Sequence, residues 1–410
     1  MRLLPVTLFA AALVMPVALS AAEADPFDAI DARLEAEFER VDRSLEEQYR
    51  LLDQALEDAY ARLSREVADT WGEAEVILPT RKQWVDYAED MQTRRIVDFE
   101  AGTVQIEQML DDAVDTVQVA AVIHDELETL RTDSEQDLAE KDLAMQYARE
   151  SLAAEGVATA PIAELPDEPV LERVIAPIAE ASLADTIAAA FQAKAPTPVN
   201  APLAAAVVTS EGKQKVSVTV PLAKNFTQTL AERYFGTIAR EARRRDLAPS
   251  LLLAMMETES SFNPRATSGV PAYGLMQLVP KSGALDAYLY VYGERMLLDP
   301  EYLYDPDQNV ELGSAYLALL QNRYLRHIDN PKSKELCAIA AYNTGASNVA
   351  RSFTGTRSVP EAAKVINAMD PDAVYNHLRN NLPYEETRNY IRKVTAAQER
   401  YAQYDDMSDS

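Results

Sequence analysis

The chain has 410 residues and a formal net charge of −27, a length typical of two or three domains. A charge this negative argues against nucleic acid as a partner, because binding to phosphate backbones relies on lysine and arginine. The single cysteine, Cys337, excludes an intrachain disulfide, and the three histidines are too widely separated to indicate a zinc site. We therefore expect no metal and no cofactor.

The acidity lies in the front part of the chain. Residues 1–222 contain 18 Lys and Arg against 43 Asp and Glu, whereas residues 223–402 contain 21 against 20. Such a difference indicates two functionally different parts. The acidic part is a candidate surface for a protein partner, or it sets the spacing of the remainder.

The first residues predict export. Residues 1–22 combine one arginine, an apolar run from Leu3 to Leu19 and small residues before an acidic stretch, which is typical of a secretory signal peptide. An uncleaved membrane anchor is the alternative. No cysteine follows the run, so a lipidated N-terminus is not expected. We expect a periplasmic protein, with association to membrane or wall left open.

The residues after the leader predict an acidic helix and then a mixed α/β domain. Residues 23–69 are charged, with apolar residues at roughly helical spacing, which fits a coiled coil or a long solvated spacer helix. Within residues 70–222, the stretch RRIVDFEAGTVQIEQ predicts a hairpin that turns at Gly102, and KQKVSVTVPL, residues 213–222, predicts another strand. Residues 151–205 are rich in Ala and Pro and look like partly ordered connections.

Residues 223–402 are dense in apolar residues with helical periodicity. We predict five helices, which begin near Phe226, Ala248, Asn309, Lys334 and Glu385, with Asn309 as an N-cap. The overall class is therefore α+β. The high density of apolar residues also predicts that residues 223–402 retain activity without residues 1–222.

Two glutamates lie two residues apart in METESSFNP, Glu257 and Glu259. At 100° per residue, Glu259 shares a helix face with Leu252 and Met255, whereas Glu257 lies on the polar side. Burial of a carboxyl raises its pKa, and a protonated carboxyl is what a general acid for glycosidic cleavage requires. The alternative is a buried salt bridge to an arginine of residues 243–245, and the residues alone leave both interpretations open.

Four motifs, in this order, resemble those of the lytic murein transglycosylases. They are ESSFNP from Glu259, GLMQ from Gly274, AYN from Ala341 and ETRNY from Glu386, and DPDQNVELGSAYLALL resembles the family's usual helix start between the second and third. This resemblance covers about residues 226–402. Residues 70–125 and 213–222 are similar, less specifically, to the N-terminal domain of the membrane-bound lytic murein transglycosylase C family.

The resemblance implies a mostly α-helical, goose-lysozyme-like catalytic domain at residues 223–402, after a smaller α/β domain and an acidic helical segment. It implies peptidoglycan glycan strands as substrate, cut between N-acetylmuramic acid and N-acetylglucosamine with formation of 1,6-anhydromuramyl ends. Glu259 would act as acid and then as base, oriented by Tyr390. The implied substrate-binding residues are Ser260, Gly274, Met276, Gln277, Tyr342 and Asn343.

Two other functions stay open beside this one. A goose-type muramidase would use water and leave reducing ends, and a murein-binding scaffold would keep the fold without catalysis, although the intact Glu259 argues against it. The sequence also departs from the family. Members are lipoproteins, for which this chain lacks the cysteine, and Thr344 stands where a second glycine is common.

Overall fold

The computed structural model describes residues 26–110, 114–157, 165–192, 203–210, 212–269 and 271–409. The chain divides into two compact units, one ending at Glu47 and the other beginning at Gln48. The described part of the first unit is the N-terminal stretch of helix α1 (Pro26–Trp71). The expected signal peptide, residues 1–22, lies outside the described residues.

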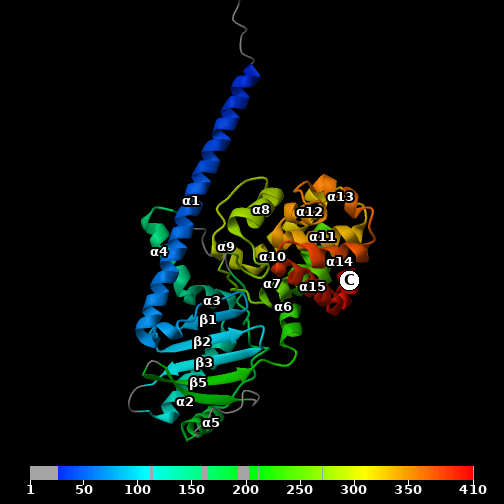
Figure 1. Ribbon diagram of the computed structural model, residues 1–410. Coiled ribbons are helices and arrows are strands. Elements are labelled where there is room, and N and C mark those ends of the chain that lie inside the picture. The colour runs from blue at the N-terminus through cyan, green and yellow to red at the C-terminus, as the bar shows by residue number, and fades with distance from the viewer. Residues whose placement is uncertain are drawn as a thin grey trace, which may run out of the picture. The chain divides into compact units, whose positions relative to one another are not determined.

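One antiparallel sheet of five strands, in the order β1-β2-β3-β5-β4, lies in the first part of this unit (Figure 1). The strands are β1 (Gln83–Tyr87), β2 (Thr93–Asp98), β3 (Thr103–Met109), β4 (Ala204–Ser210) and β5 (Lys213–Pro221). Val97 pairs with Val104 and Ile106 with Val218, and all four side chains are buried. The β-branched alternation therefore forms one covered face, and the predicted hairpin and the strand near residues 213–222 are confirmed.

Four helices accompany the sheet: α2 (Thr116–Thr132), α3 (Glu135–Lys141), α4 (Leu143–Ala154) and α5 (Glu180–Gln192). α2 packs on β3, α5 packs on β4, and the two helices contact each other. The expectation of loose connections over residues 151–205 is wrong for α5 and for the start of β4. Alanine has the highest helix propensity, and Leu183, Ile187 and Ala190 supply a buried stripe at helical spacing.

The C-terminal part of α1 is packed rather than solvated. Tyr49, Leu56, Leu63 and Trp71 are buried, and the Tyr49 hydroxyl donates a hydrogen bond to the carbonyl of Pro280 at 3.1 Å. Neither a coiled coil nor a solvated spacer helix therefore describes residues 49–71. This stretch belongs to the core of the second unit.

The remaining helices form the region that contains the motifs. They are α6 (Phe226–Arg245), α7 (Pro249–Ser260), α8 (Leu285–Tyr292), α9 (Pro300–Tyr304), α10 (Pro306–Leu319), α11 (Pro331–Thr344), α12 (Ala346–Thr354), α13 (Val359–Ile366), α14 (Pro371–Asn381) and α15 (Glu385–Arg400). The five predicted helices correspond to α6, α7, α10, α11 and α15. Many helices with one antiparallel sheet confirm the α+β class.

Asn309 is not the N-cap that we expected. α10 begins at Pro306, and the Asp305 carboxylate caps it by accepting hydrogen bonds from the backbone N–H groups of Asp307 at 2.9 Å and Gln308 at 3.1 Å. Aspartate before proline meets the requirements of a helix start better than a residue one turn later. Asn309 is instead fully buried inside the helix.

Candidate active site

Helix α7 carries both candidate glutamates and is buried on nearly all sides. Pro249 opens its first turn, and α6 and α15 pack against it (Figure 1). Ser261 and Phe262 then adopt left-handed backbone, with φ of 54° and 66°, so the helix ends one residue after Glu259. Because such backbone is uncommon for residues with side chains, packing must hold it, and Phe262 is fully buried with its ring edge against Tyr401.

Glu259 is buried, with only 5% of its surface exposed. Burial raises the pKa of its carboxyl to about 7, and the Tyr390 hydroxyl and the positive charge of Arg81 oppose this rise. The salt bridge considered as an alternative is not supported, because Arg244 and Arg245 pair with glutamates of α6 and α10. Glu259 is thus a carboxyl that exchanges its proton near neutral pH.

Tyr390 of α15 lies beside Glu259. Its side chain is buried, and its hydrogen bond lowers the pKa of the carboxyl. Burial and then the charge of Glu259 raise the pKa of the Tyr390 hydroxyl well above its ordinary value. The hydroxyl makes no hydrogen bond of standard geometry to any described residue. The contact with Glu259 therefore departs from standard hydrogen-bond geometry, as catalytic contacts often do before a substrate binds.

Glu257 connects α7 to the end of α15 through hydrogen bonds and is not a solvated charge. Its carboxylate accepts hydrogen bonds from Nη2 of Arg400 at 2.5 Å and from the hydroxyl of Tyr401 at 2.6 Å. The prediction of a surface charge is corrected because α15 packs on α7 and leaves the side chain 22% exposed.

Glu259 opens onto a pocket of about 530 Å³. Of the predicted site residues, Glu259, Gln277, Tyr342 and Asn343 line it, whereas Ser260, Gly274, Met276 and Tyr390 are not part of its lining. The rest of the wall comes from residues 79–81 and 267–269, with Ala272, Val279 and Glu386. The pocket therefore combines two carboxyl groups with one arginine.

The GLMQ motif forms a tight turn beneath this pocket. Gly274 has a φ of +74°, and a Cβ there would lie 2.2 Å from the carbonyl oxygen of Leu303, so only glycine fits. Asn309 ties the turn to α10, because its Nδ2 donates to the Tyr273 carbonyl at 3.0 Å and its Oδ1 accepts from the Met276 N–H at 2.7 Å. Gly274 thus permits close packing within the protein, and the expected approach of its backbone to a sugar stays a prediction.

Ser260 and Met276 are fully buried. The Ser260 hydroxyl donates to the carbonyl of Leu275 at 2.8 Å, which fastens the end of α7 to the turn. Met276 packs against Gly313, where a Cβ would lie 2.4 Å from the methionine sulfur. Both side chains therefore position the turn and are not part of the pocket lining, and the expected sugar contacts of these two residues stay a prediction.

Three polar side chains of the predicted set do line the pocket. Gln277 donates through Nε2 to two backbone carbonyls, at 3.1 and 3.2 Å, while its Oε1 has no partner among the described residues. The Tyr342 hydroxyl donates to the Met276 carbonyl at 2.9 Å. Asn343 accepts through Oδ1 from the Thr387 hydroxyl at 2.7 Å. The Oε1 of Gln277 is therefore a buried acceptor without a partner among the described residues, whereas the Oδ1 of Asn343 is engaged by Thr387.

Sequence analysis missed the part of the wall that precedes β1. Arg81 lines the pocket, its Nη1 lies 3.5 Å from Oε1 of Glu386, and its carbonyl accepts a hydrogen bond from Asn263 across 182 residues of sequence. No local pattern marks Arg81. Glu386, by contrast, stands first in the ETRNY motif and could have been selected there. The expectation that residues 223–402 act alone is not supported by this shared wall.

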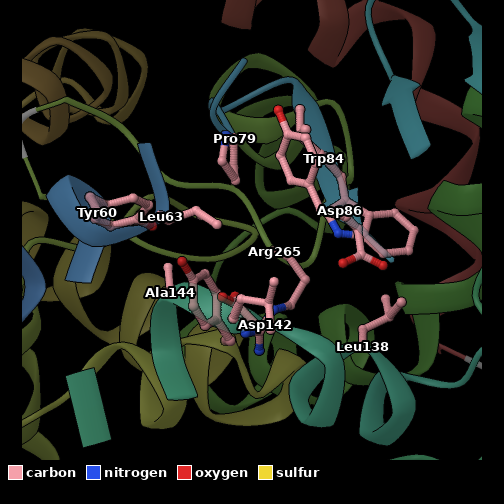
Figure 2. A pocket seen from close by; sticks show the side chains of 13 residues that line it. Tyr60, Leu63, Pro79, Trp84, Asp86, Leu138, Asp142, Ala144 and Arg265 are labelled. Carbon is pink, nitrogen blue, oxygen red and sulfur yellow. Dashed lines mark hydrogen bonds and ion pairs between the residues drawn. The ribbon is translucent and has the colours of Figure 1, made fainter. Parts of the chain in front are cut away.

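A buried ionic cluster joins the same two regions (Figure 2). Arg265 follows the ESSFNP motif, and its Nη2 lies 2.6 Å from Asp142, the N-cap of α4, and 3.4 Å from Glu301 of α9. Its guanidinium also lies over the ring of Tyr304 at 4.0 Å. Arg265 is 5% exposed. The segment that carries pocket residues 267–269 is therefore held by a charge from outside the helical region.

Comparison with known proteins assigns the chain to a family. Residues 236–364 match the transglycosylase SLT domain, and residues 49–148 match the N-terminal domain of membrane-bound lytic murein transglycosylase C. A membrane-bound lytic murein transglycosylase C of Klebsiella pneumoniae (strain 342) is 32% identical over 340 residues, which are 82% of this chain and 86% of that relative. The chain belongs to the lytic murein transglycosylases.

Other lytic transglycosylases match shorter stretches. The membrane-bound lytic murein transglycosylase C of Pectobacterium atrosepticum is 42% identical over 185 residues, 45% of this chain and 51% of that protein. A solved structure, the lytic transglycosylase Slt of Pseudomonas aeruginosa, shares 30% identity over 41% of this chain, with a TM-score of 0.32, and the match spans 24% of that longer chain.

The raised pKa of Glu259 predicts how the stability of this lytic murein transglycosylase depends on pH. A carboxyl with a folded-state pKa of about 7 against an ordinary 4.5 stabilises the fold below pH 4.5, and this contribution disappears as the pH rises through 7. The difference amounts to at most about 3 kcal/mol. Glu259→Gln should therefore gain stability relative to wild type between about pH 5 and 8 in chemical denaturation. A constant difference between the two proteins would contradict the raised pKa.

Proposed function

We propose that this lytic murein transglycosylase cleaves peptidoglycan glycan strands between N-acetylmuramic acid and N-acetylglucosamine, with Glu259 as its catalytic residue. The observation that carries the proposal is a buried carboxyl with a pKa near 7 that opens onto a pocket of about 530 Å³. A group that gives up and regains a proton within one cycle works best when its pKa lies near the working pH.

In the proposed reaction, protonated Glu259 donates its proton to the glycosidic oxygen as the bond from muramyl C1 breaks. The resulting carboxylate then takes the proton of the muramyl C6 hydroxyl while that oxygen attacks C1. A 1,6-anhydromuramyl end forms, no water is consumed, and Glu259 is again protonated. Tyr390 would orient the carboxyl through its contact with Glu259, which would become a hydrogen bond of standard geometry when charge develops on Glu259.

The polar groups of the pocket have matching tasks. The free Oε1 of Gln277 would accept from an acetamido N–H, since a buried acceptor without a partner is costly unless a ligand satisfies it. Asn343, with its Oδ1 held by Thr387, would donate through its amide nitrogen, and the Tyr342 ring would cover a sugar face. Ser260, Gly274 and Met276 would act indirectly, by fixing the turn that carries Gln277.

One observation favours a second function, a hydrolase. Glu386 also lines the pocket, and a water-using glycosidase needs a second carboxylate to activate water. Against this role, the Glu386 side chain is 65% exposed and lies opposite Arg81. A hydroxyl on the substrate itself has an effective concentration on the order of 10⁵ M or more when it is well oriented, so attack from C6 needs no second base.

Digestion of murein in water enriched in heavy oxygen separates the two functions. We expect muramyl products without label at C1 and lighter by one water than muramidase products, as measured by mass spectrometry. Glu386→Gln should change the rate without changing the products. Labelled reducing ends that disappear in Glu386→Gln would instead establish a hydrolase in which Glu386 is the base.

We also propose that the protein acts in the periplasm, where its substrate lies. The basis is the signal-like pattern of residues 1–22 and the name of the relatives, which are described as membrane-bound. Among the helices of the described ranges, none has the length and apolar character of a bilayer-spanning segment. Cell fractionation should recover the protein in the periplasmic extract, and recovery with salt-washed membranes would contradict this placement. The acidic front part remains a candidate surface for a protein partner.

A further inference from the structure

One pocket residue has no task in the reaction described above. Arg81 lies in the segment just before β1 and lines the pocket together with Glu259 and Glu386. It is the one cationic side chain among the described lining residues. Since the other two charged groups among the described lining residues are carboxyls, Arg81 is the charged group there that favours an anion.

The backbone that carries Arg81 is fixed from two sides. The Thr80 N–H donates to the carbonyl of Gln83 at 2.9 Å, and the Phe99 N–H donates to the carbonyl of Lys82 at 2.9 Å, which closes the segment onto the sheet. From the helical region, Nδ2 of Asn263 donates to the carbonyl of Arg81 at 3.4 Å. The guanidinium is therefore presented from a held position, while its side chain remains 43% exposed.

The partner of Arg81 within the protein is weakly held. Its Nη1 lies 3.5 Å from Glu386, whose side chain is 65% exposed. An ion pair between groups this exposed contributes little to stability, because water and salt screen both charges. A ligand carboxylate can therefore displace Glu386, which returns to water at small cost. Guanidinium also binds a planar carboxylate through two parallel hydrogen bonds, a geometry that a single long contact does not provide.

We infer that Arg81 binds a carboxylate carried on the lactyl side of the muramyl residue, and so makes the enzyme prefer anionic strands. The inference rests on the proposed function, because it places a murein strand in this pocket. The N-acetylated sugars of the strand are neutral. Its carboxylates lie either on the stem peptide or, where the peptide has been removed, on the lactyl group itself. Both sources present the same chemistry to Arg81.

The test compares one substrate before and after loss of its charge. The amino groups of the stem peptides are first blocked by acetylation. In half of the preparation, the carboxylates of the stem peptides are then converted to neutral methylamides with carbodiimide and methylamine. For the wild type, KM should rise about tenfold on the neutral strands, which is the size expected for loss of one charge-assisted pair. Arg81→Gln should raise KM about tenfold on the anionic strands and should show no further rise on the neutral ones.

Lys82→Gln is the matched control. Lys82, like Arg81, lowers the pKa of Glu259, but it is not part of the pocket lining and pairs with Glu100 at 3.2 Å. Both variants should shift the alkaline limb of the pH–rate profile to higher pH, because each removes a positive charge that lowers the pKa of Glu259. Each enzyme is therefore measured at its own pH optimum. Lys82→Gln should keep the tenfold preference for anionic strands, and a loss of that preference in both variants would overturn a specific role for Arg81.

The remaining outcomes separate this inference from the proposed function. Equal losses by Arg81→Gln on anionic and neutral strands would overturn the inference while cleavage of murein stands. A wild type that cleaves neither preparation would remove the proposed function itself. A third substrate, strands stripped of peptide by an amidase, identifies the source of the charge. A tenfold effect of Arg81→Gln on stripped strands shows that Arg81 binds the free lactyl carboxylate. An effect confined to peptide-bearing strands, in which the lactyl carboxyl is an amide, assigns the stem peptide.

Discussion

Replacing Glu259 with glutamine is expected to lower the rate of glycan cleavage about 10²- to 10⁴-fold, the range within which one general acid or base contributes. The upper end is more reasonable here, because the same carboxyl acts in both steps of the proposed reaction. Glutamine has nearly the same shape, so the buried site should keep its packing. The measurement is the release of soluble muropeptides, with circular dichroism to confirm the fold.

Glu257→Gln on the same helix is the control. Glu257 does not line the pocket, and its carboxylate is engaged by Arg400 and Tyr401. We expect this variant to keep nearly full activity and to lose about 1 kcal/mol of stability or less, as for a partly exposed ion pair. Comparable losses of activity in the two variants, or full activity of Glu259→Gln, would remove Glu259 from its assigned role. A wild type without cleavage activity would leave only a murein-binding function.

The second large effect is expected far from the reacting carboxyl. Asp142→Asn should destabilise the fold by about 3 kcal/mol, at the lower end of the cost of breaking a buried ion pair. Arg265 would keep Glu301 at 3.4 Å but lose the closer partner at 2.6 Å. Asparagine is also a good N-cap, so the start of α4 should not contribute to the loss. Denaturant unfolding measures the change.

Glu150→Gln provides the comparison on the same helix. Glu150 pairs with Arg62 at 3.2 Å, but the two side chains are 68% and 47% exposed. Removal of this charge should leave the free energy of unfolding nearly unchanged, because water and salt screen both exposed groups. If Asp142→Asn and Glu150→Gln destabilise the protein equally, then the cluster around Arg265 does not tie the two regions together.

Periodicity was sufficient to predict which of the two glutamates is buried. One carboxyl among leucine and methionine neighbours on a helix predicts burial, and the structure places Glu259 there, 5% exposed and with a raised pKa. The hairpin could also be predicted from the sequence, because alternating apolar residues on both sides of Gly102 specify which side chains face the core. Both predictions depend on residues that are close in sequence.

The missed features depend on residues that are distant in sequence. Arg81 reaches the pocket only because the segment before β1 contacts Asn263, and Asn309 is read as a cap until its contacts with Tyr273 and Met276 are known. Gly274 and Met276 belong to the right motif, yet a motif does not say whether a residue faces the ligand or supports one that does. Long-range packing decides that question.

The left-handed turn after Glu259 also has a consequence for attempts to make this enzyme more heat-resistant. Ser261 and Phe262 hold φ values of 54° and 66°, a conformation that costs residues with side chains about 1 kcal/mol or more each. Glycine at position 261 would relieve that cost, so a screen for higher melting temperature should favour it. The same substitution would make the end of α7 more flexible, and this end positions the carboxyl of Glu259. Variants selected for heat resistance at this turn should therefore lose turnover, whereas gains made on the exposed face of α14 should not.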